Sequence, residues 1–230
     1  MIHCAALTNV DLCETEKDKA FYVNAFGTGC VAAACFKCNV RLIYISTDYV
    51  FDGILNRPYT EYDIANGGDT IYGQSKFAGE TYVRYLCPNH VICRVSWLYG
   101  SGTSSFIYKI MALSREHKPF LNIVNDQHGN PTSALSVAHE LKEIINRPNL
   151  FGTFHITYEG EATWYEFATE IFKINKNNQV IKPCTSSEYI SRVKRPKNSC
   201  LDKMMIRLTG LPKMPHWKIE LKNFLDHENI

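Results

Sequence analysis

Residues 41–80 hold the pattern that most restricts how this chain can fold. The apolar run Leu-Ile-Tyr-Ile at 42–45 is continuous, and it is too short for a typical helix. Such a run is typical of a parallel strand that is covered on both faces. Ser46, Thr47 and Asp48 follow directly. They place polar groups beyond the carboxyl end of the strand, which is where open parallel sheets bind their ligands.

Tyr72 and Lys76 form the second part of the pattern. They lie four residues apart at the start of a helix-like segment, so both side chains lie on one helical face. A lysine ammonium beside a phenol favours the phenolate, which suits the pair to passing a proton to a developing alkoxide. The spacing alone is weak evidence, because it occurs by chance in many helices. The preceding strand end strengthens it, because a hydroxyl there can meet the same bound carbonyl that Tyr72 faces.

The rest of the chain alternates between strand-like and helix-like segments. Strands are expected at 42–45, 91–95, 121–124 and 152–156, and helices at about 14–38, 72–86, 104–117 and 133–146. A capping box at 163–166 opens a further amphipathic helix, 174–200 is expected to be loop, and a helix near 221–225 closes the chain. This alternation predicts an α/β fold with a parallel sheet. Since strands thin out after about residue 150, we expect a main domain over 1–150 and a smaller lobe over 151–230.

Composition excludes several classes of function. The 230 residues are 45% hydrophobic and 21% charged, as in soluble globular proteins. A formal net charge of +2 provides no basic field for a nucleic acid. No apolar run approaches the roughly 20 residues of a membrane span, so no membrane partner is expected. The amino end shows no basic-then-apolar leader, which makes a cytoplasmic location the default expectation.

The nine cysteines are odd in number and scattered along the chain. Cys35 and Cys38 form a C-x-x-C pair, but no second pair or histidine pair follows at zinc spacing. We therefore expect no metal site and a reduced set of thiols, as in cytosolic proteins.

Five motifs occur in an order that resembles a known family. They are S-T-D-Y-V-F-D-G, Y-G-Q-S-K-x-x-G-E, R-V-S-W-L-Y-G, V-N-D-Q-H-G-N-P-T and R-P-K-N-S. Together they resemble the dTDP-4-dehydrorhamnose reductases, a branch of the extended short-chain dehydrogenase/reductase family. The opening C-A-A-L-T-N-V-D and V-N-A-F-G-T resemble the fourth strand, turn and helix of that family. The likeness covers nearly the whole chain and implies a Rossmann-like parallel sheet with a smaller α/β substrate lobe.

The resemblance assigns a catalytic trio. Thr47, Tyr72 and Lys76 match the catalytic threonine, tyrosine and lysine of these reductases. Tyr72 would give a proton to the C4 oxygen of a dTDP-4-keto sugar while NADPH delivers hydride to C4, which yields dTDP-L-rhamnose. Lys76 would lower the pKa of the tyrosine and bind the nicotinamide ribose, and Thr47 would hydrogen-bond the reacting oxygen. NADPH is the implied cofactor, and NADH is the other candidate.

The resemblance also implies binding residues. Asp48 and Trp97 match positions that contact the substrate, as Thr47 does, and Ala5, Ala6 and Thr8 match the turn that lies along the cofactor. Two of these have structural alternatives. Trp97 could fill a core, because tryptophan is usually largely buried, and Asp48 could cap a turn.

Several polar residues are given no definite role in the site. His128 and His155 are interpreted as structural or surface residues. Arg192, Lys194 and Arg195 could meet a nucleotide diphosphate, or they could form a solvated basic loop, which we slightly favour.

The glycine-rich start of a dinucleotide-binding sheet is not found in this chain. The sequence contains no G-x-x-G-x-x-G, the turn whose backbone N–H groups hold the pyrophosphate. By the resemblance, the chain begins inside the fourth strand, and the first three strands are missing. We therefore expect an N-terminally truncated sheet with an open edge at residues 2–6, and weak or no NADPH binding. The expected partners are a second copy of the chain or another chain that completes the sheet.

An alternative function stays open at this point. The regulatory beta subunit of methionine adenosyltransferase resembles the same reductases and serves as a binding partner. Retention of Thr47, Tyr72, Lys76 and Trp97 together favours an enzyme over a pure scaffold.

Overall fold

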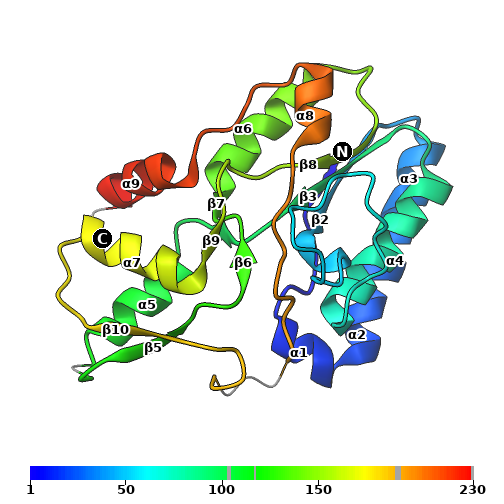
Figure 1. Ribbon diagram of the computed structural model, residues 1–230. Coiled ribbons are helices and arrows are strands. Elements are labelled where there is room, and N and C mark those ends of the chain that lie inside the picture. Colours follow the sequence, from blue (N-terminus) through cyan, green and yellow to red (C-terminus); the bar gives the residue numbers. More distant parts are fainter. Residues whose placement is uncertain (103–104, 117, 190–192, 229–230) are drawn as a thin grey trace.

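Four parallel strands form the main sheet of the computed structural model, which describes residues 1–102, 105–116, 118–189 and 193–228 (Figure 1). The spatial order is β1-β2-β3-β8. These strands are β1 (Ile2–His3), β2 (Leu42–Thr47), β3 (His90–Val95) and β8 (Gly152–His155). In register, Ile43 of β2 lies between Ile2 of β1 and Val91 of β3. The predicted α/β class and its parallel sheet are confirmed.

Helices cover both faces of this sheet, which explains why β2 and β3 are continuous apolar runs. Tyr44 and Ile92 face α3 (Thr28–Lys37) and α4 (Ile71–Leu86), with which they form one buried cluster. Ile43 and Cys93 face the opposite way, into the larger core that includes α6 (Ala134–Ile145). Figure 1 shows α3 and α4 together on one side of the sheet and α6 on the other.

The single helix expected over 14–38 is wrong in detail. The structure has α1 (Val10–Thr15), α2 (Lys17–Phe21), the π-helix η1 (Tyr22–Gly27) and then α3. The first break falls at Glu16, whose φ of −116° and ψ of 58° are not helical. The wider turns of η1 place Asn24 in a fully buried position against α4. Wide turns of this kind are frequent at functional sites.

The remaining strands are short pairs. β5 (Leu121–Val124) pairs with β10 (Ile181–Cys184) and β4 (Leu98–Tyr99) with β7 (Thr132–Ser133), both in parallel. β6 (His128–Gly129) pairs antiparallel with β9 (Ala162–Thr163). The strand β10 corrects the expectation of an unbroken loop over 174–200. It reads as loop because its second and third residues, Lys182 and Pro183, are exposed on an edge strand, where proline is tolerated.

Three further helices lie near their expected places, namely α5 (Phe106–Ser114), α7 (Trp164–Ile174) and α9 (Trp217–Glu228). The structure also has α8 (Met204–Thr209) and the 3₁₀ turn η2 (Asp48–Val50), which the sequence patterns did not predict. α5 is shorter than the expected 104–117, and the two ends of that expected range, residues 104 and 117, lie outside the described residues. The expected capping box is present, because the Thr163 side chain accepts from the N–H of Glu166 while the Glu166 carboxylate accepts from that of Thr163.

The predicted division at residue 150 stays a prediction, and strand pairing crosses that point. β8 follows residue 150 yet joins the main sheet beside β3. β5 precedes residue 150 yet pairs with β10. One buried core runs through both parts, from Ile43 of β2 to Leu225 of α9.

β1 lies at the edge of the main sheet. Within the described residues it pairs only with β2, and Met1 and Ile2 are exposed. An edge of this kind leaves backbone N–H and C=O groups available for another strand. Among the residues that the structure describes, no helix is both long enough and apolar enough to cross a membrane.

Candidate active site at the strand ends

The carboxyl ends of β2 and β3 bring together polar residues that are far apart in sequence. Thr47 ends β2, and its hydroxyl donates to Asp48 Oδ1 at 3.0 Å. Ser96 follows β3, and its hydroxyl donates to Asp48 Oδ2 at 2.8 Å. All three residues are buried. The Asp48 carboxylate thus ties the two strand ends together, and it holds the Thr47 hydroxyl at the end of β2.

Burial is the main electrostatic influence on Asp48. It raises the pKa of the Asp48 carboxyl, while hydrogen bonds with Ser199, Ser96 and Thr47 act in the opposite direction. Sequence reasoning assigned roles to Thr47 and Asp48 but not to Ser96, although Ser96 follows a strand and lies in the motif R-V-S-W-L-Y-G.

Tyr72 lies in the first turn of α4. The helix is capped by Thr70, whose hydroxyl accepts from the N–H of Gly73 at 3.0 Å. Gly73 is needed there, because a Cβ at this position would lie 2.2 Å from the Tyr49 carbonyl oxygen. The Tyr72 ring meets the Tyr49 ring edge-on, with centroids 5.5 Å apart. The chain therefore brings the start of α4 unusually close to the end of β2.

The environment of Tyr72 keeps its phenol protonated. Burial is the largest effect and raises the pKa of Tyr72, and hydrogen bonding with the Thr47 side chain opposes that shift. Thr47 and Tyr72 are thus brought together as expected from the sequence.

Lys76 lies one turn further along α4 and is 3% exposed. Its ammonium donates to the Ile45 carbonyl oxygen at 2.7 Å and lies 4.1 Å from the centroid of the Tyr44 ring. Burial lowers the pKa of Lys76 to about 7, and the charge of Glu80 acts in the opposite direction. The hydrogen bond to Ile45 directs the amine at the end of β2. An ammonium has three N–H groups, so two remain for other acceptors beside this one.

This burial predicts a pH dependence of stability. In the folded protein the pKa of Lys76 is about 7, whereas the ordinary value is 10.5, so between these pH values the unfolded chain binds more protons. The Lys76 contribution to the free energy of unfolding should therefore rise as pH increases through that window. Relative to Lys76→Met, the wild-type chain should gain thermal stability from about pH 7 to about pH 10.5.

Thermal melts of both chains across this range test the prediction, with Lys17→Met as the control for loss of one exposed lysine. A difference between wild type and Lys76→Met that stays constant with pH would contradict it.

Asn24 is a functional candidate that sequence reasoning missed. Its amide oxygen accepts from the Leu7 N–H at 2.7 Å, and its Nδ2 donates to the Leu7 carbonyl and to Ser75 Oγ, both at 3.0 Å. It thus connects the turn after β1 to the helix that carries Tyr72 and Lys76. Asn24 lies in the V-N-A-F-G-T segment that resembles the family, but sequence reasoning assigned it no role.

The turn expected to lie along the cofactor follows β1. Ala5 and Thr8 are exposed, and Ala6 is half-buried. They are at the same end of the sheet as Thr47 and Ser96, because the strands are parallel. Their role in cofactor binding stays a prediction.

Trp97 turns the chain out of the main sheet. Its φ of 45° is in the left-handed region, and the next two residues form β4. The half-buried indole stacks on Trp164, with ring centroids 3.5 Å apart and planes inclined by 4°. Trp164 is the first residue of α7, the amphipathic helix that the sequence predicted, and its stack on Trp97 was not foreseen. Trp97 thus packs against another aromatic ring, yet it remains partly accessible beside Ser96.

The polar residues that were given no definite role lie in different environments. His155 is fully buried and contacts the Asp202 carbonyl through Nδ1 at 2.8 Å, while His128 is exposed in β6. Lys194 pairs with Asp69 at 3.2 Å, and Arg195 lies 3.8 Å from Asp11.

Arg192 lies outside the described residues. Both remaining cations, Lys194 and Arg195, therefore have acidic partners in the first half of the chain.

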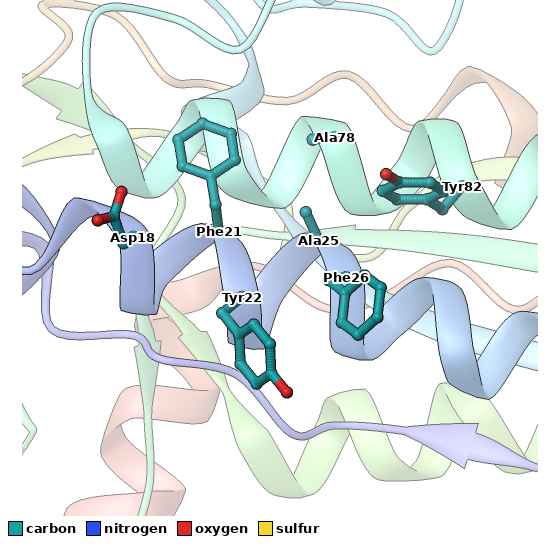
Figure 2. Close-up of a pocket in the computed structure, with 7 residues that line it drawn as sticks. All are labelled: Asp18, Phe21, Tyr22, Ala25, Phe26, Ala78 and Tyr82. Carbon is teal, nitrogen blue, oxygen red and sulfur yellow. The ribbon is translucent and has the colours of Figure 1, made fainter.

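A shallow pocket lies apart from these residues, between the α2–η1 segment and α4 (Figure 2). Its lining is mainly aromatic and consists of Asp18, Phe21, Tyr22, Ala25, Phe26, Ala78 and Tyr82. In the part of the chain that is described, no three histidine, cysteine or acidic residues lie close enough to hold a metal ion. All nine cysteines lie in that part, and all are free.

The structure combines a parallel sheet, a threonine at the end of one strand, and a tyrosine and a lysine on the adjacent helix. This combination defines the class of protein. The class is the Rossmann-like proteins of the short-chain dehydrogenase/reductase type. The chain belongs to the family described as the RmlD substrate binding domain, whose model matches residues 1–230.

Similar proteins include named reductases. A spore coat polysaccharide biosynthesis protein, SpsK from Bacillus subtilis, is 35% identical over 229 residues, which cover 100% of this chain and 79% of the relative. The crystal structure of a dTDP-4-dehydrorhamnose reductase from Clostridium acetobutylicum has a TM-score of 0.95 and 40% identity, and the match covers 100% of this chain and 80% of that one. The reductase from Bacillus anthracis, solved in complex with NADP, has a TM-score of 0.94 and 37% identity, with 98% and 79% covered.

Proposed function

We propose that the protein is an NADPH-dependent reductase that converts dTDP-4-dehydro-6-deoxy-L-mannose into dTDP-L-rhamnose. The observation that carries this proposal is the convergence of Thr47, Tyr72 and Lys76 at the end of β2, in a chain of this family. The likeness to dTDP-4-dehydrorhamnose reductases supports the substrate, and the relative solved with NADP supports the cofactor.

The chain's own residues handle the proton. Bound NADPH would supply the hydride to C4 of the sugar. Tyr72 donates its phenolic proton to the C4 oxygen as negative charge develops there, and the Thr47 hydroxyl hydrogen-bonds the same oxygen. Burial favours the protonated phenol before the reaction, which is the form that a general acid requires.

The residues present fit one end of the cofactor. Lys76 has N–H groups to spare beside the end of β2 and can hold ribose hydroxyls, while its charge assists loss of the Tyr72 proton. The small side chains of Ala5 and Ala6, with Thr8, leave room for a dinucleotide along the turn after β1. At the diphosphate end the sequence offers no G-x-x-G-x-x-G turn.

Asp48 and Trp97 are proposed to contact the substrate. Asp48 orients Thr47, and the half-buried indole of Trp97 provides an apolar surface next to Ser96. Sugar rings present apolar C–H faces that pack well on such a surface.

The regulatory-subunit alternative is not favoured, since the relatives reported above include reductases rather than subunits of methionine adenosyltransferase. We also propose a cytoplasmic location, where NADPH and nucleotide sugars are available and where free thiols are the rule.

We propose a second copy of the chain as the partner at the aromatic pocket. Tyr22 and Phe26 are exposed there and stack on each other, with centroids 5.4 Å apart (Figure 2). Sedimentation velocity measures self-association of the purified chain directly.

The 230-residue chain should bind NADPH weakly. Its sequence lacks the glycine-rich turn that supplies most pyrophosphate contacts, so we expect a Kd well above the micromolar range. Isothermal titration calorimetry of the purified chain with NADPH tests this. A micromolar Kd would show that the residues after β1 hold the dinucleotide without that turn.

Product formation tests the function itself. The chain is incubated with dTDP-4-dehydrorhamnose and with NADPH raised to the millimolar range, so that weak cofactor binding is overcome. We expect dTDP-L-rhamnose, identified by mass spectrometry, and stoichiometric oxidation of NADPH. If no product forms although the chain binds dTDP-L-rhamnose, the proposed reductase activity is wrong.

A further inference from the structure

The stack of Trp97 on Trp164 is a rigid arrangement next to the candidate active site. Ring centroids 3.5 Å apart and planes inclined by only 4° mean that the two indoles lie face to face with little offset. Aromatic pairs left to themselves prefer offset or edge-to-face geometries. The surrounding residues must therefore impose this arrangement.

The Trp97 side of the stack is constrained by the backbone. A positive φ of 45° is uncommon for a bulky residue and persists only where the surroundings determine it. The Trp97 carbonyl accepts from the Thr132 N–H at 3.3 Å, which ties it to the start of β7. Ser96, immediately before it, donates to Asp48. Trp97 therefore directly follows the residue that hydrogen-bonds Asp48, the group that orients Thr47.

Gly129 provides space for the Trp97 indole. A Cβ at Gly129 would lie 2.3 Å from Cε2 and 2.4 Å from Nε1 of Trp97, closer than real side-chain contacts allow. Gly129 is in β6, opposite Ala162 of β9, which leads directly into α7 and Trp164. The β6–β9 pair thus contains Gly129, which leaves room for Trp97, and it leads into Trp164, whose ring stacks on Trp97.

The Trp164 ring is itself held from two sides. Its Nε1–H donates to Gln127 Oε1 at 3.2 Å, and the Gln127 amide donates to Ser186 Oγ at 2.9 Å. The Phe106 ring packs against Trp164 with centroids 4.7 Å apart. The hydrogen bond to Gln127 and the contact with Phe106 together fix the plane of the Trp164 indole.

We propose that Trp164 is a positioning residue that acts through Trp97. By stacking on Trp97, it sets the place of that indole against the sugar ring of the bound nucleotide sugar. Gly129 is the second determinant of the same position. This inference rests on the proposed function, because it takes a dTDP-linked sugar as the ligand.

Binding of two ligands that differ only in the sugar tests the inference without turnover. Calorimetry measures the Kd for dTDP-L-rhamnose and for dTDP with wild type, Trp164→Leu, Trp164→Phe and Gly129→Ala. We expect Trp164→Leu to weaken dTDP-L-rhamnose binding by about tenfold and to leave dTDP binding within about twofold. Trp164→Phe keeps an aromatic face and should largely restore the affinity for the sugar. Gly129→Ala displaces Trp97 and should reproduce the loss while Trp164 is intact.

Two controls separate positioning from folding. Tyr165→Leu alters the next residue of α7, is half-buried like Trp164, and should leave both affinities unchanged. Far-ultraviolet circular dichroism shows whether each variant keeps the fold of the wild type.

Several results would overturn the inference. One is an unchanged affinity of Trp164→Leu and Gly129→Ala for dTDP-L-rhamnose, and another is an equal loss for both ligands. Wild type that binds dTDP-L-rhamnose no more tightly than dTDP would also overturn it. Sugar-dependent binding without any turnover would count against the proposed reductase activity alone.

Discussion

Tyr72→Phe is expected to lower kcat for reduction of the 4-keto sugar by about a thousandfold, the usual range for loss of a general acid. The variant keeps the ring, its edge-on contact with Tyr49 and the start of α4, and it removes only the phenolic hydroxyl, which carries the proton. Affinity for dTDP-L-rhamnose should change little, because the proton acts at the transition state. Oxidation of NADPH at saturating substrate measures kcat, and calorimetry measures affinity.

Two tyrosines serve as matched controls for this prediction. Tyr85→Phe lies on the same helix, is 83% exposed, and should keep full activity. Tyr49→Phe removes the hydroxyl of the ring that lies beside Tyr72. Burial raises the pKa of Tyr49 to about 12. If Tyr49→Phe were inactive and Tyr72→Phe active, the acid would be Tyr49 and the assignment of Tyr72 would be wrong.

Glu80→Gln is expected to lower the free energy of unfolding by about 3–5 kcal/mol, as when one partner of a buried ion pair is removed. The Glu80 carboxylate is fully buried. It accepts from Arg94 Nε at 2.9 Å and Nη2 at 2.8 Å, and from Ser46 Oγ at 2.6 Å. If Glu80 loses its negative charge, the positive charge of the nearly buried Arg94 guanidinium is no longer neutralised by Glu80 in the core beside the sheet. Urea-induced unfolding measures the loss.

The same pair predicts an acid sensitivity with a definite sign. Burial raises the pKa of Glu80, but the charge of Arg94 and its hydrogen bonds outweigh burial and hold that pKa at about 2, below its ordinary 4.5. The stabilisation by the carboxylate is therefore present above about pH 4.5 and is lost as pH falls towards 2. In Glu80→Gln this part of the pH dependence should disappear.

An exposed ion pair gives the control. Glu16→Gln removes a carboxylate that pairs with Lys19 in solvent, and it should cost less than about 1 kcal/mol. A cost for Glu80→Gln as small as that for Glu16→Gln would show that Arg94 finds other partners or water.

Local patterns were enough to predict the strands of the main sheet and the placing of Tyr72 and Lys76 on one helical face, whereas the trio itself was assigned by the family resemblance. β2 is a short apolar run, and the Tyr72–Lys76 spacing is a property of one helix, so neither needs distant contacts. The break of the expected helix at Glu16 was missed because residues 14–38 keep nearly helical apolar spacing throughout. β10 was missed because an edge strand carries exposed polar residues and gives no apolar signal.

The sequence by itself determined the alternation of strands and helices, the order of the family motifs, and the residue types that can move a proton. Only the tertiary structure decided that Asp48 joins the ends of β2 and β3, that Asn24 connects Leu7 to α4, and that Trp164 stacks on Trp97. The reason is physical: local propensity depends on neighbours along the chain. Burial, hydrogen bonding and stacking depend on which segments the closed core brings within a few ångströms of each other.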